Sequence, residues 1–195
     1  MELILASGNP HKAEEFNELF DTSIIKVDAA PEKLEVVEDG TTFQENAFKK
    51  AEAYFKKFKK PTLADDSGLC VPARTDILGI HSARYADHLP DYQQKNDHLL
   101  GELQNLKDDK RKAYFVCYIC LYLSPEEIYY FEGRVHGVIS ERQQGEKGFG
   151  YDPVFLPDGQ NGLSLAELPE WKNIHSHRAK AAKACQQFIQ GYEKR

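Results

Sequence analysis

The sequence lacks three features that would each assign it to a broad class of protein. None of its apolar runs approaches the roughly 20 residues of a membrane-spanning helix. The N-terminal stretch 1–6 has no basic leader and only a short apolar run, so we expect no signal peptide and a cytoplasmic protein. The net charge is −6, which argues against a nucleic-acid-binding protein. A small phosphorylated ligand is compatible with that charge, because it needs only a local cluster of positive groups.

Cysteine is scarce, and its placement argues against a metal or redox site. Two of the four cysteines, Cys117 and Cys120, have the C-x-x-C spacing of such sites, but they lie in an apolar and aromatic run typical of a strand. Residues three apart on a strand face opposite sides of the sheet. We therefore predict reduced thiols that pack in the core.

Short apolar runs alternate with helical patterns along the 195 residues, a length that suits one large domain or two closely joined lobes. This alternation predicts an α/β protein. We find no internal repeat, low-complexity segment or linker. Strands are expected at 3–6, 23–29, 62–64 and 69–71, a hairpin at 113–139 with its turn at 124–127, and helices up to residue 20, at 43–58, at 91–106 and from about 176 onward.

Two adjacent carboxylates, Asp65 and Asp66, follow the expected strand at 62–64. Such a pair is costly in a buried place unless a cation or several donors compensate it. Gly68 would let the backbone turn after the pair. Asp, Ser and Gly are also common turn formers, so the segment is either an ordinary turn or a magnesium site at a strand end.

Two helix starts carry further polar residues. Ser7 to Lys12 forms a strand–turn–helix start whose backbone N–H groups favour anions, but it lacks the glycine and the Gly-Lys-Ser/Thr ending of a Walker A loop. Thr42 and Glu45 have the spacing of a capping box. Lys50 is either a solvated lysine of this helix or a functional cation.

The order of these polar clusters is more informative than any one of them. The segments ADDSGL at 64–69, SARY at 82–85, GFGYDP at 148–153 and SHR at 176–178 together resemble the inosine/xanthosine triphosphate pyrophosphatase family. These enzymes hydrolyse non-standard purine nucleoside triphosphates, and the resemblance covers nearly the whole chain. It implies an elongated mixed sheet flanked by helices, one pyrophosphatase domain over 1–195 with two lobes and an active cleft between them, and a homodimer.

The resemblance also implies a role for each matched residue. Asp66 and Glu45 would bind Mg²⁺, Asp66 would also act as the base, and Lys50 would stabilise negative charge on the leaving pyrophosphate. A carboxylate can cap a helix with one oxygen and meet a metal with the other, so both interpretations of Glu45 stand. The substrate contacts implied are Ser7, Gly8, Asn9, Lys12, Ser67, Phe149, Gly150, Tyr151, Asp152, Lys172, His177 and Arg178.

The purine would be recognised in two ways. Phe149 would stack on the base, which gives affinity without selectivity. His177 and Arg178 would meet the keto group of hypoxanthine or xanthine, and arginine can only donate. The implied reaction is attack of water at the α-phosphorus of ITP, dITP or XTP, with release of pyrophosphate. The rival interpretations are a pyrophosphatase for other modified nucleotides and an inactive nucleotide-binding regulator.

One stretch departs from the family pattern. The family usually has a glycine-glycine and a proline-glycine before the Ser-Ala-Arg-Tyr motif, whereas only Gly79 remains in the segment 74–81 of this chain. The departure concerns the conformation of this loop and leaves the implied metal and phosphate residues in place.

Overall fold

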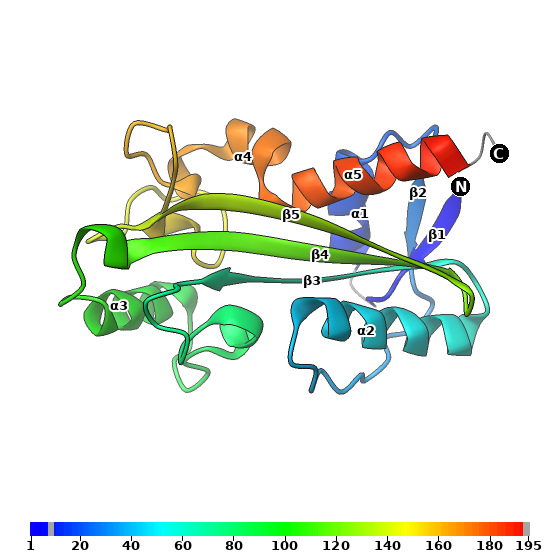
Figure 1. The fold of residues 1–195 in the computed structure, drawn as a ribbon, viewed down its shortest axis with the longest axis horizontal. Coiled ribbons are helices and arrows are strands. Elements are labelled where there is room, and N and C mark those ends of the chain that lie inside the picture. The colour runs from blue at the N-terminus through cyan, green and yellow to red at the C-terminus, as the bar shows by residue number, and fades with distance from the viewer. Residues whose placement is uncertain (8–9, 193–195) are drawn as a thin grey trace. The chain divides into compact units, whose positions relative to one another are not determined.

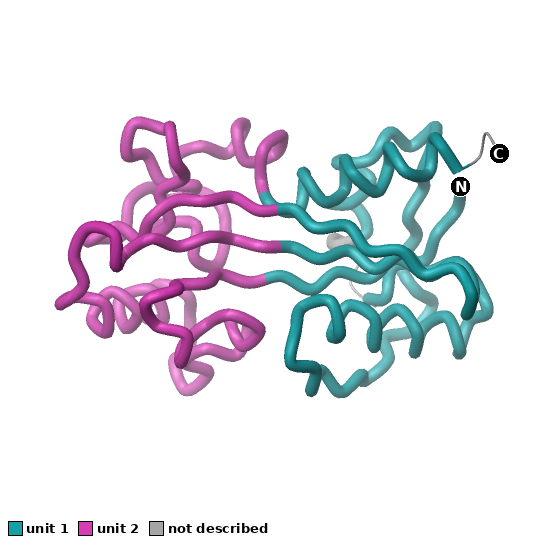
Figure 2. The backbone as a smooth tube through the Cα atoms, in the orientation of Figure 1, with its two compact units in different colours: residues 1–67, 117–133, 177–195 teal, residues 68–116, 134–176 magenta. Residues whose placement is uncertain are grey.

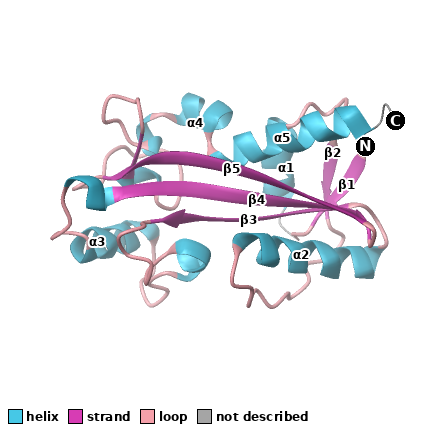
Figure 3. Cartoon of the chain, viewed as in Figure 1, coloured by secondary structure: helices cyan, strands magenta, loops and turns pink. Residues whose placement is uncertain are grey.

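The protein is described from a computed structural model that covers residues 1–7 and 10–192, with the backbone alone for residues 10–12. It has the expected α/β architecture (Figures 1 and 3). Within the described ranges no helix combines the length and the apolarity needed to cross a membrane. The strands are β1 (Glu2–Leu5), β2 (Lys26–Ala29), β3 (Thr62–Cys70), β4 (Lys112–Ser124), β5 (Glu127–Ile139) and β6 (Phe155–Pro157), and the α-helices are α1 (Pro10–Leu19), α2 (Phe43–Phe58), α3 (Tyr92–Glu102), α4 (Pro169–His175) and α5 (His177–Tyr192).

The strands form one mixed sheet in the order β2-β1-β3-β4-β5-β6. β1 is parallel to both β2 and β3, whereas β5 and β6 are antiparallel. Only residues 125 and 126 separate β4 from β5, which confirms the predicted hairpin. A mixed sheet flanked by helices is what the family resemblance implied.

The chain divides into two compact units, shown in Figure 2. Unit 1 comprises Met1–Ser67, Cys117–Gly133 and His177–Arg195, and unit 2 comprises Gly68–Val116 and Arg134–Ser176. Strands β3, β4 and β5 each contribute residues to both units.

Unit 1 buries apolar side chains on both faces of its strands. On one face Phe16 of α1 and Cys185 and Ile189 of α5 pack with Leu63 of β3. On the other face the small side chains Ala47 and Ala51 of α2 pack against β3 and β4. Burying a large apolar side chain contributes about 1.5–3 kcal/mol, so these faces fix how α1, α2 and α5 lie on the strands.

Unit 2 has a separate core around the other ends of the strands. Leu99 and Leu103 of α3 pack against Leu69 of β3 and Phe115 of β4, and Phe155 of β6 joins them. Tyr151 also belongs to this core, so the segment that follows β5 is anchored to it.

The cysteines behave as the strand periodicity predicted. Cys117 lies in the core beneath α1 and α5, whereas Cys120 lies in the core beneath α2, so the two sulfurs are on opposite faces of β4. None of the four cysteines forms a disulfide bond with another residue that the structure describes. Burial raises the pKa of the Cys120 thiol to about 12, which keeps it protonated and unreactive.

The predicted turn at the acidic pair is wrong. Asp65 to Gly68 lie inside β3, which continues without a break to Cys70, and the two short strands expected at 62–64 and 69–71 are one strand. Turn-forming residues are overridden here because β3 lies beside β4 in the sheet, whereas within the described ranges β1 pairs with β3 only at Thr62 and Leu63. Gly68 is thus an interior strand residue and not a turn.

Helix α2 begins with the capping box that the sequence predicted. The Thr42 hydroxyl accepts a hydrogen bond from the Glu45 backbone N–H at 3.1 Å, and Glu45 Oε2 accepts one from the Thr42 N–H at 3.2 Å. At its other end, Lys59 takes a left-handed conformation and its N–H donates to Phe55 O. These contacts fix the ends of the helix that carries Lys50.

Replacing Thr42 with alanine should lower the free energy of unfolding by about 1 kcal/mol, because the Glu45 N–H loses its acceptor. Urea denaturation of Thr42→Ala measures the change. Thr75→Ala, at an exposed threonine outside any helix, is the matched control and should stay within about 0.5 kcal/mol of the unmodified protein. Equal changes in the two variants would show that the cap contributes nothing specific.

Candidate functional site

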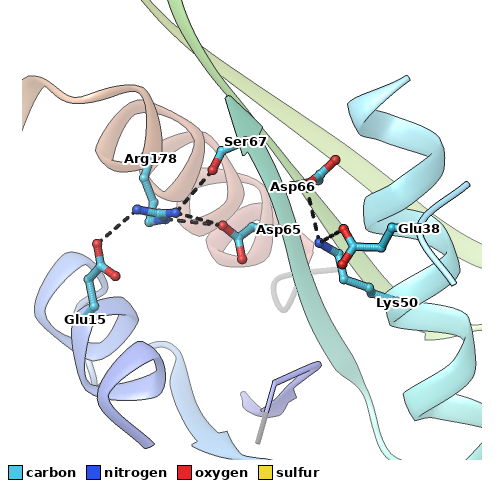
Figure 4. Close-up of polar contacts among 7 residues, drawn as sticks. All are labelled: Glu15, Glu38, Lys50, Asp65, Asp66, Ser67 and Arg178. Atoms are coloured by element: carbon cyan, nitrogen blue, oxygen red, sulfur yellow. Dashed lines mark hydrogen bonds and ion pairs between the residues drawn. The ribbon is translucent and has the colours of Figure 1, made fainter. Parts of the chain in front are cut away.

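The acidic pair of β3 presents its two carboxylates to opposite faces of the strand. Figure 4 shows Asp65 and Ser67 on the side of α1 and α5, and Asp66 on the side of α2. This follows from the two-residue period of a strand, which the apolar neighbours obey as well: Leu63 packs beneath α1 and α5, and Ala64 beneath α2. The two aspartates therefore have different environments and different chemistry.

Asp66 shares a buried lysine with a second carboxylate. Lys50 Nζ lies 3.4 Å from Asp66 Oδ1 and 3.0 Å from Glu38 Oε2. Only about 15% of each of the Lys50 and Asp66 side chains is exposed. Burial raises the pKa of the Asp66 carboxyl, and the charge of Glu38 adds to that rise, although Lys50 and Asn46 act against it. Burial also opposes charge on Lys50, but the surrounding carboxylates outweigh it and raise the pKa of the ammonium.

The second oxygen of Asp66 is available for a cation. Asp66 Oδ2 is buried and accepts no hydrogen bond from the residues that the structure describes. A buried carboxylate oxygen without a donor is costly, and a hard divalent cation is a suitable partner. No group of three or more His, Cys, Asp and Glu residues in the described part of the chain could hold a metal by itself. Asp66 thus fits a Mg²⁺ ion that takes most of its remaining ligands from water and phosphate.

Asn46 completes this group from α2, where it lies one turn before Lys50. Its side chain is 1% exposed, and its Oδ1 accepts a hydrogen bond from the Gly40 N–H at 2.9 Å. A Cβ on Gly40 would approach Asn46 Oδ1 to 2.6 Å, so only glycine fits beside it. Asn46 thereby ties the segment after Glu38 to the helix that carries Lys50.

Glu45, the other predicted magnesium ligand, is exposed at the start of α2. Its Oε2 accepts from the Thr41 N–H at 2.6 Å, from the Thr41 hydroxyl at 2.8 Å and from the Thr42 N–H. The Thr41 hydroxyl and N–H hold the pKa of the Glu45 carboxyl below its usual value. The capping role of Glu45 is confirmed, and it uses one of the two carboxylate oxygens.

Asp65 has a structural partner, Arg178, that no sequence pattern indicated. Arg178 at the start of α5 donates from Nε and Nη2 to Asp65 Oδ2, at 3.3 and 3.1 Å. Arg178 Nη1 donates to Glu15 Oε1 of α1 at 3.0 Å, and Nη2 lies 3.4 Å from Ser67 Oγ (Figure 4). The Asp65 side chain is 2% exposed and that of Arg178 10%, so this is a buried ion pair. Burial opposes the charge on Arg178, but Asp65 outweighs it and raises the pKa of the guanidinium.

A polar cavity of about 250 Å³ lies in unit 1 beside Lys50. Its wall includes Ser7, the segment 33–36, Glu38 and Tyr54. The Tyr54 hydroxyl accepts a hydrogen bond from the Leu34 N–H at 2.9 Å, which anchors that segment. Ser7 thus reaches the same cavity as Lys50, whereas the predicted phosphate ligands Gly8 and Asn9 and the side chain of Lys12 lie outside the described residues.

In unit 2 the predicted stacking residue, Phe149, stands on a tight turn. Phe149 is 63% exposed, and Lys172 Nζ lies 4.1 Å from the centroid of its ring. Lys172 Nζ also donates to Asp152 Oδ2 at 2.5 Å, and the same oxygen accepts from the Phe149 N–H at 2.9 Å. A Cβ on Gly148 would lie 2.2 Å from Asp152 Oδ2, so this turn requires glycine there. Phe149, Asp152 and Lys172, three of the predicted substrate contacts, thus lie together at this turn.

Tyr151 and Gly150 have different roles in that turn. Tyr151 is 5% exposed and its hydroxyl donates to Ser82 O at 2.6 Å, so its side chain anchors the turn to unit 2. Gly150 adopts a φ of 64°, which glycine reaches without strain. Its carbonyl accepts from Asn96 Nδ2 at 3.0 Å.

His177 is the first residue of α5 and is 8% exposed. The backbone of β5 passes very close to it: a Cβ on Gly133 would lie 2.0 Å from His177 O and 2.6 Å from Ala181 N. Gly133 therefore allows α5 to begin against the strand, and this places His177 and Arg178. No sequence pattern singles out Gly133, because a glycine inside a strand has several possible causes.

The segment 74–81, which departs from the family pattern, is held in place by two ion pairs of Arg74. Arg74 pairs with Asp76 at 2.8 Å and with Glu102 of α3 at 3.5 Å. Leu78, although not glycine, has a φ of 61°, and Gly79 has a φ of 59°. Leu78 is buried in the core of unit 2, so its packing compensates for the unfavourable backbone conformation.

The sheet and its polar groups define an α/β protein with a carboxylate–lysine cluster on a central strand and an exposed aromatic ring on a glycine turn. The chain belongs to the Ham1 family, whose model matches residues 3–188.

Individual members are similar over almost the whole chain. The dITP/XTP pyrophosphatase of Listeria monocytogenes is 43% identical, over 93% of this chain and 91% of the relative. That of Aquifex aeolicus is 41% identical, over 100% and 99%. Among solved structures, the Staphylococcus aureus Ham1 protein superposes with a TM-score of 0.87 at 37% identity, covering 98% of this chain and 100% of that one. The dITP/XTP pyrophosphatase of Mycobacterium abscessus gives 0.79 at 37% identity, covering 95% and 98%.

Proposed function

We propose that this protein hydrolyses the non-standard purine nucleoside triphosphates ITP, dITP and XTP to monophosphate and pyrophosphate. Its relatives in Listeria and Aquifex are named dITP/XTP pyrophosphatases. The observation that carries the proposal for this chain is Asp66, whose buried Oδ2 has no donor among the described residues while its Oδ1 faces Lys50. A base and a cation are thereby held side by side on rigid elements.

The chemistry assigned to unit 1 begins with Asp66 and Lys50. Asp66 would take the proton of the attacking water, and burial raises its pKa in the direction that makes a carboxylate a better base. Lys50, kept charged by the surrounding carboxylates, would stabilise negative charge on the leaving pyrophosphate. The α-phosphorus is the point of attack in this scheme.

Mg²⁺ is the cofactor that this donor set suits. Asp66 Oδ2 would hold it, with the Glu45 oxygen that the cap does not use as the second predicted ligand. Glu38 is a further candidate ligand, because it shares Lys50 with Asp66. When bound, Mg²⁺ would neutralise charge on the phosphates.

The remaining contacts divide between the phosphate and the base. Ser7, Gly8, Asn9, Lys12 and Ser67 would donate to phosphate oxygens. Phe149 would stack on the purine, with Gly150, Tyr151, Asp152 and Lys172 shaping the turn that carries it. His177 and Arg178 would meet the keto group, and the described contacts of Arg178 use one N–H of Nη1, which leaves its second N–H for a substrate acceptor.

A panel of nucleoside triphosphates with product identification tests the proposal. With Mg²⁺ we expect ITP, dITP and XTP to give the monophosphate and pyrophosphate, and ATP to be turned over far more slowly. Orthophosphate with IDP would contradict attack at the α-phosphorus. Comparable turnover of pyrimidine nucleotides would favour a wider range of modified nucleotides, and tight binding of ITP without turnover would favour an inactive regulator. Cytoplasmic location and a homodimer stay predictions.

A further inference from the structure

Asn96 of α3 contacts the turn that presents Phe149, although no sequence motif pointed to it. Its side chain is 1% exposed. Asn96 Nδ2 donates to the Gly150 carbonyl at 3.0 Å and lies 3.5 Å from Gln143 Oε1. A side-chain amide therefore reaches the backbone of the residue that follows Phe149.

Three hydrogen bonds hold the turn around Phe149, and Asn96 donates one of them. Asp152 Oδ2 accepts from the Phe149 N–H, and the Tyr151 hydroxyl donates to Ser82 O. Between these contacts Gly150 adopts a φ of 64°. Glycine can also adopt many other backbone conformations, so this residue by itself does not fix the turn. The hydrogen bond from Asn96 selects one orientation of the peptide after Gly150.

Asn96 is an unfavourable choice for a residue that only fills space. Its Oδ1 is buried and has no hydrogen-bond partner among the residues that the structure describes. A buried acceptor without a partner destabilises the fold, and an apolar side chain of similar size would avoid that loss. An apolar residue could not supply the Nδ2 donor that Asn96 offers to the Gly150 carbonyl.

We propose that Asn96 is a positioning residue for the base-binding end of the site. It holds the Gly150 carbonyl, and thereby the turn 148–152, in the conformation that exposes the Phe149 ring next to Lys172. This inference rests on the proposed function, in which Phe149 stacks on the purine. Asn96 touches neither substrate nor metal in this scheme, so its loss should weaken binding of the base and leave the chemical step intact.

The experiment compares Asn96→Leu, which keeps the volume but loses the donor, with the unmodified protein. For ITP we expect KM to rise about threefold to tenfold, the effect of one lost hydrogen bond, with kcat unchanged within about twofold. Inosine monophosphate, tested as a competitive inhibitor, should weaken by the same factor. Inorganic pyrophosphate, which has no base, should inhibit both proteins equally.

Two control variants separate this inference from a structural effect and from the proposed function. Leu100→Ala removes a partly buried side chain from the same helix, and it should lower the melting temperature while leaving KM unchanged. Phe149→Ala should raise KM at least as much as Asn96→Leu.

An Asn96→Leu protein with a lowered melting temperature and an unchanged KM, or with weakened pyrophosphate inhibition, overturns the positioning role. If Phe149→Ala leaves KM unchanged, the stacking role in the proposed function fails and the inference fails with it.

Discussion

Replacing Asp66 with asparagine is expected to lower kcat for ITP by about 10²- to 10⁴-fold, the usual contribution of a general base. Asparagine keeps the shape of the side chain and the contact with Lys50, but it can neither accept a proton nor supply a charged oxygen to Mg²⁺. Steady-state release of pyrophosphate measures the loss. Asp76→Asn, at an exposed aspartate of unit 2 that pairs with Arg74, is the matched control and should retain turnover. Near-normal turnover of Asp66→Asn would remove Asp66 from the catalytic centre.

The same variant should be as stable as the unmodified protein or more stable. Burial raises the pKa of the folded Asp66 above its unfolded value, so the free energy of unfolding falls as the pH rises from the unfolded pKa through the folded pKa. Near neutral pH the neutral amide escapes that penalty. Lys50 still has Glu38 as a partner at 3.0 Å. A loss of activity with no loss of the free energy of unfolding would separate a catalytic role from a structural one.

Replacing Arg178 with alanine is expected to lower the free energy of unfolding by about 3–5 kcal/mol, the range for breaking a buried ion pair. The Asp65 side chain is 2% exposed and would be left as a buried charge without its guanidinium. Glu15, whose side chain is 40% exposed, can turn to water instead. Guanidinium chloride denaturation gives the change, and Arg142→Ala, at an exposed arginine, should stay within about 0.5 kcal/mol.

A double replacement tells whether the loss comes from the stranded charge. Asp65→Val combined with Arg178→Met removes both charges and fills the space with apolar side chains, and replacements of this kind are often neutral. We expect the double variant to be more stable than Arg178→Ala. If it is less stable than that single variant, the cost of the arginine substitution lies in packing and not in the charge of Asp65.

The sequence predicted most of the elements because their patterns are local. The helical pattern at 43–58 and the Thr42–Glu45 box located α2 at the residues where it occurs, and the alternation of β4 separated Cys117 from Cys120 correctly. The same two-residue period applies to Asp65 and Asp66, but Ser67 and Gly68 suggested a turn instead. Only the neighbouring strands decide between those interpretations, and their contacts are not local in sequence.

Side-chain partners in the site were less accessible to sequence analysis. Arg178 meets Asp65 across 113 positions of the chain, and both residues carry other plausible roles when taken alone. Glu38 lies in the acidic segment 32–39, which has four carboxylates, and nothing in its spacing singles it out as the partner of Lys50. Asn46 lies one turn before Lys50 in α2, but its hydrogen bond from the Gly40 N–H depends on how the preceding loop folds back.

The alternation along β3 also limits how this segment can change in evolution. Loss or gain of a single residue before Asp65 would shift the register by one and rotate every following side chain to the other face of the strand. Asp65 would then face Lys50, and Asp66 would face Arg178. Both carboxylates would remain in the sequence, but each would take the place of the other in the structure. Substitutions can be tested one position at a time here, whereas insertions and deletions in β3 must come in pairs to leave the site intact.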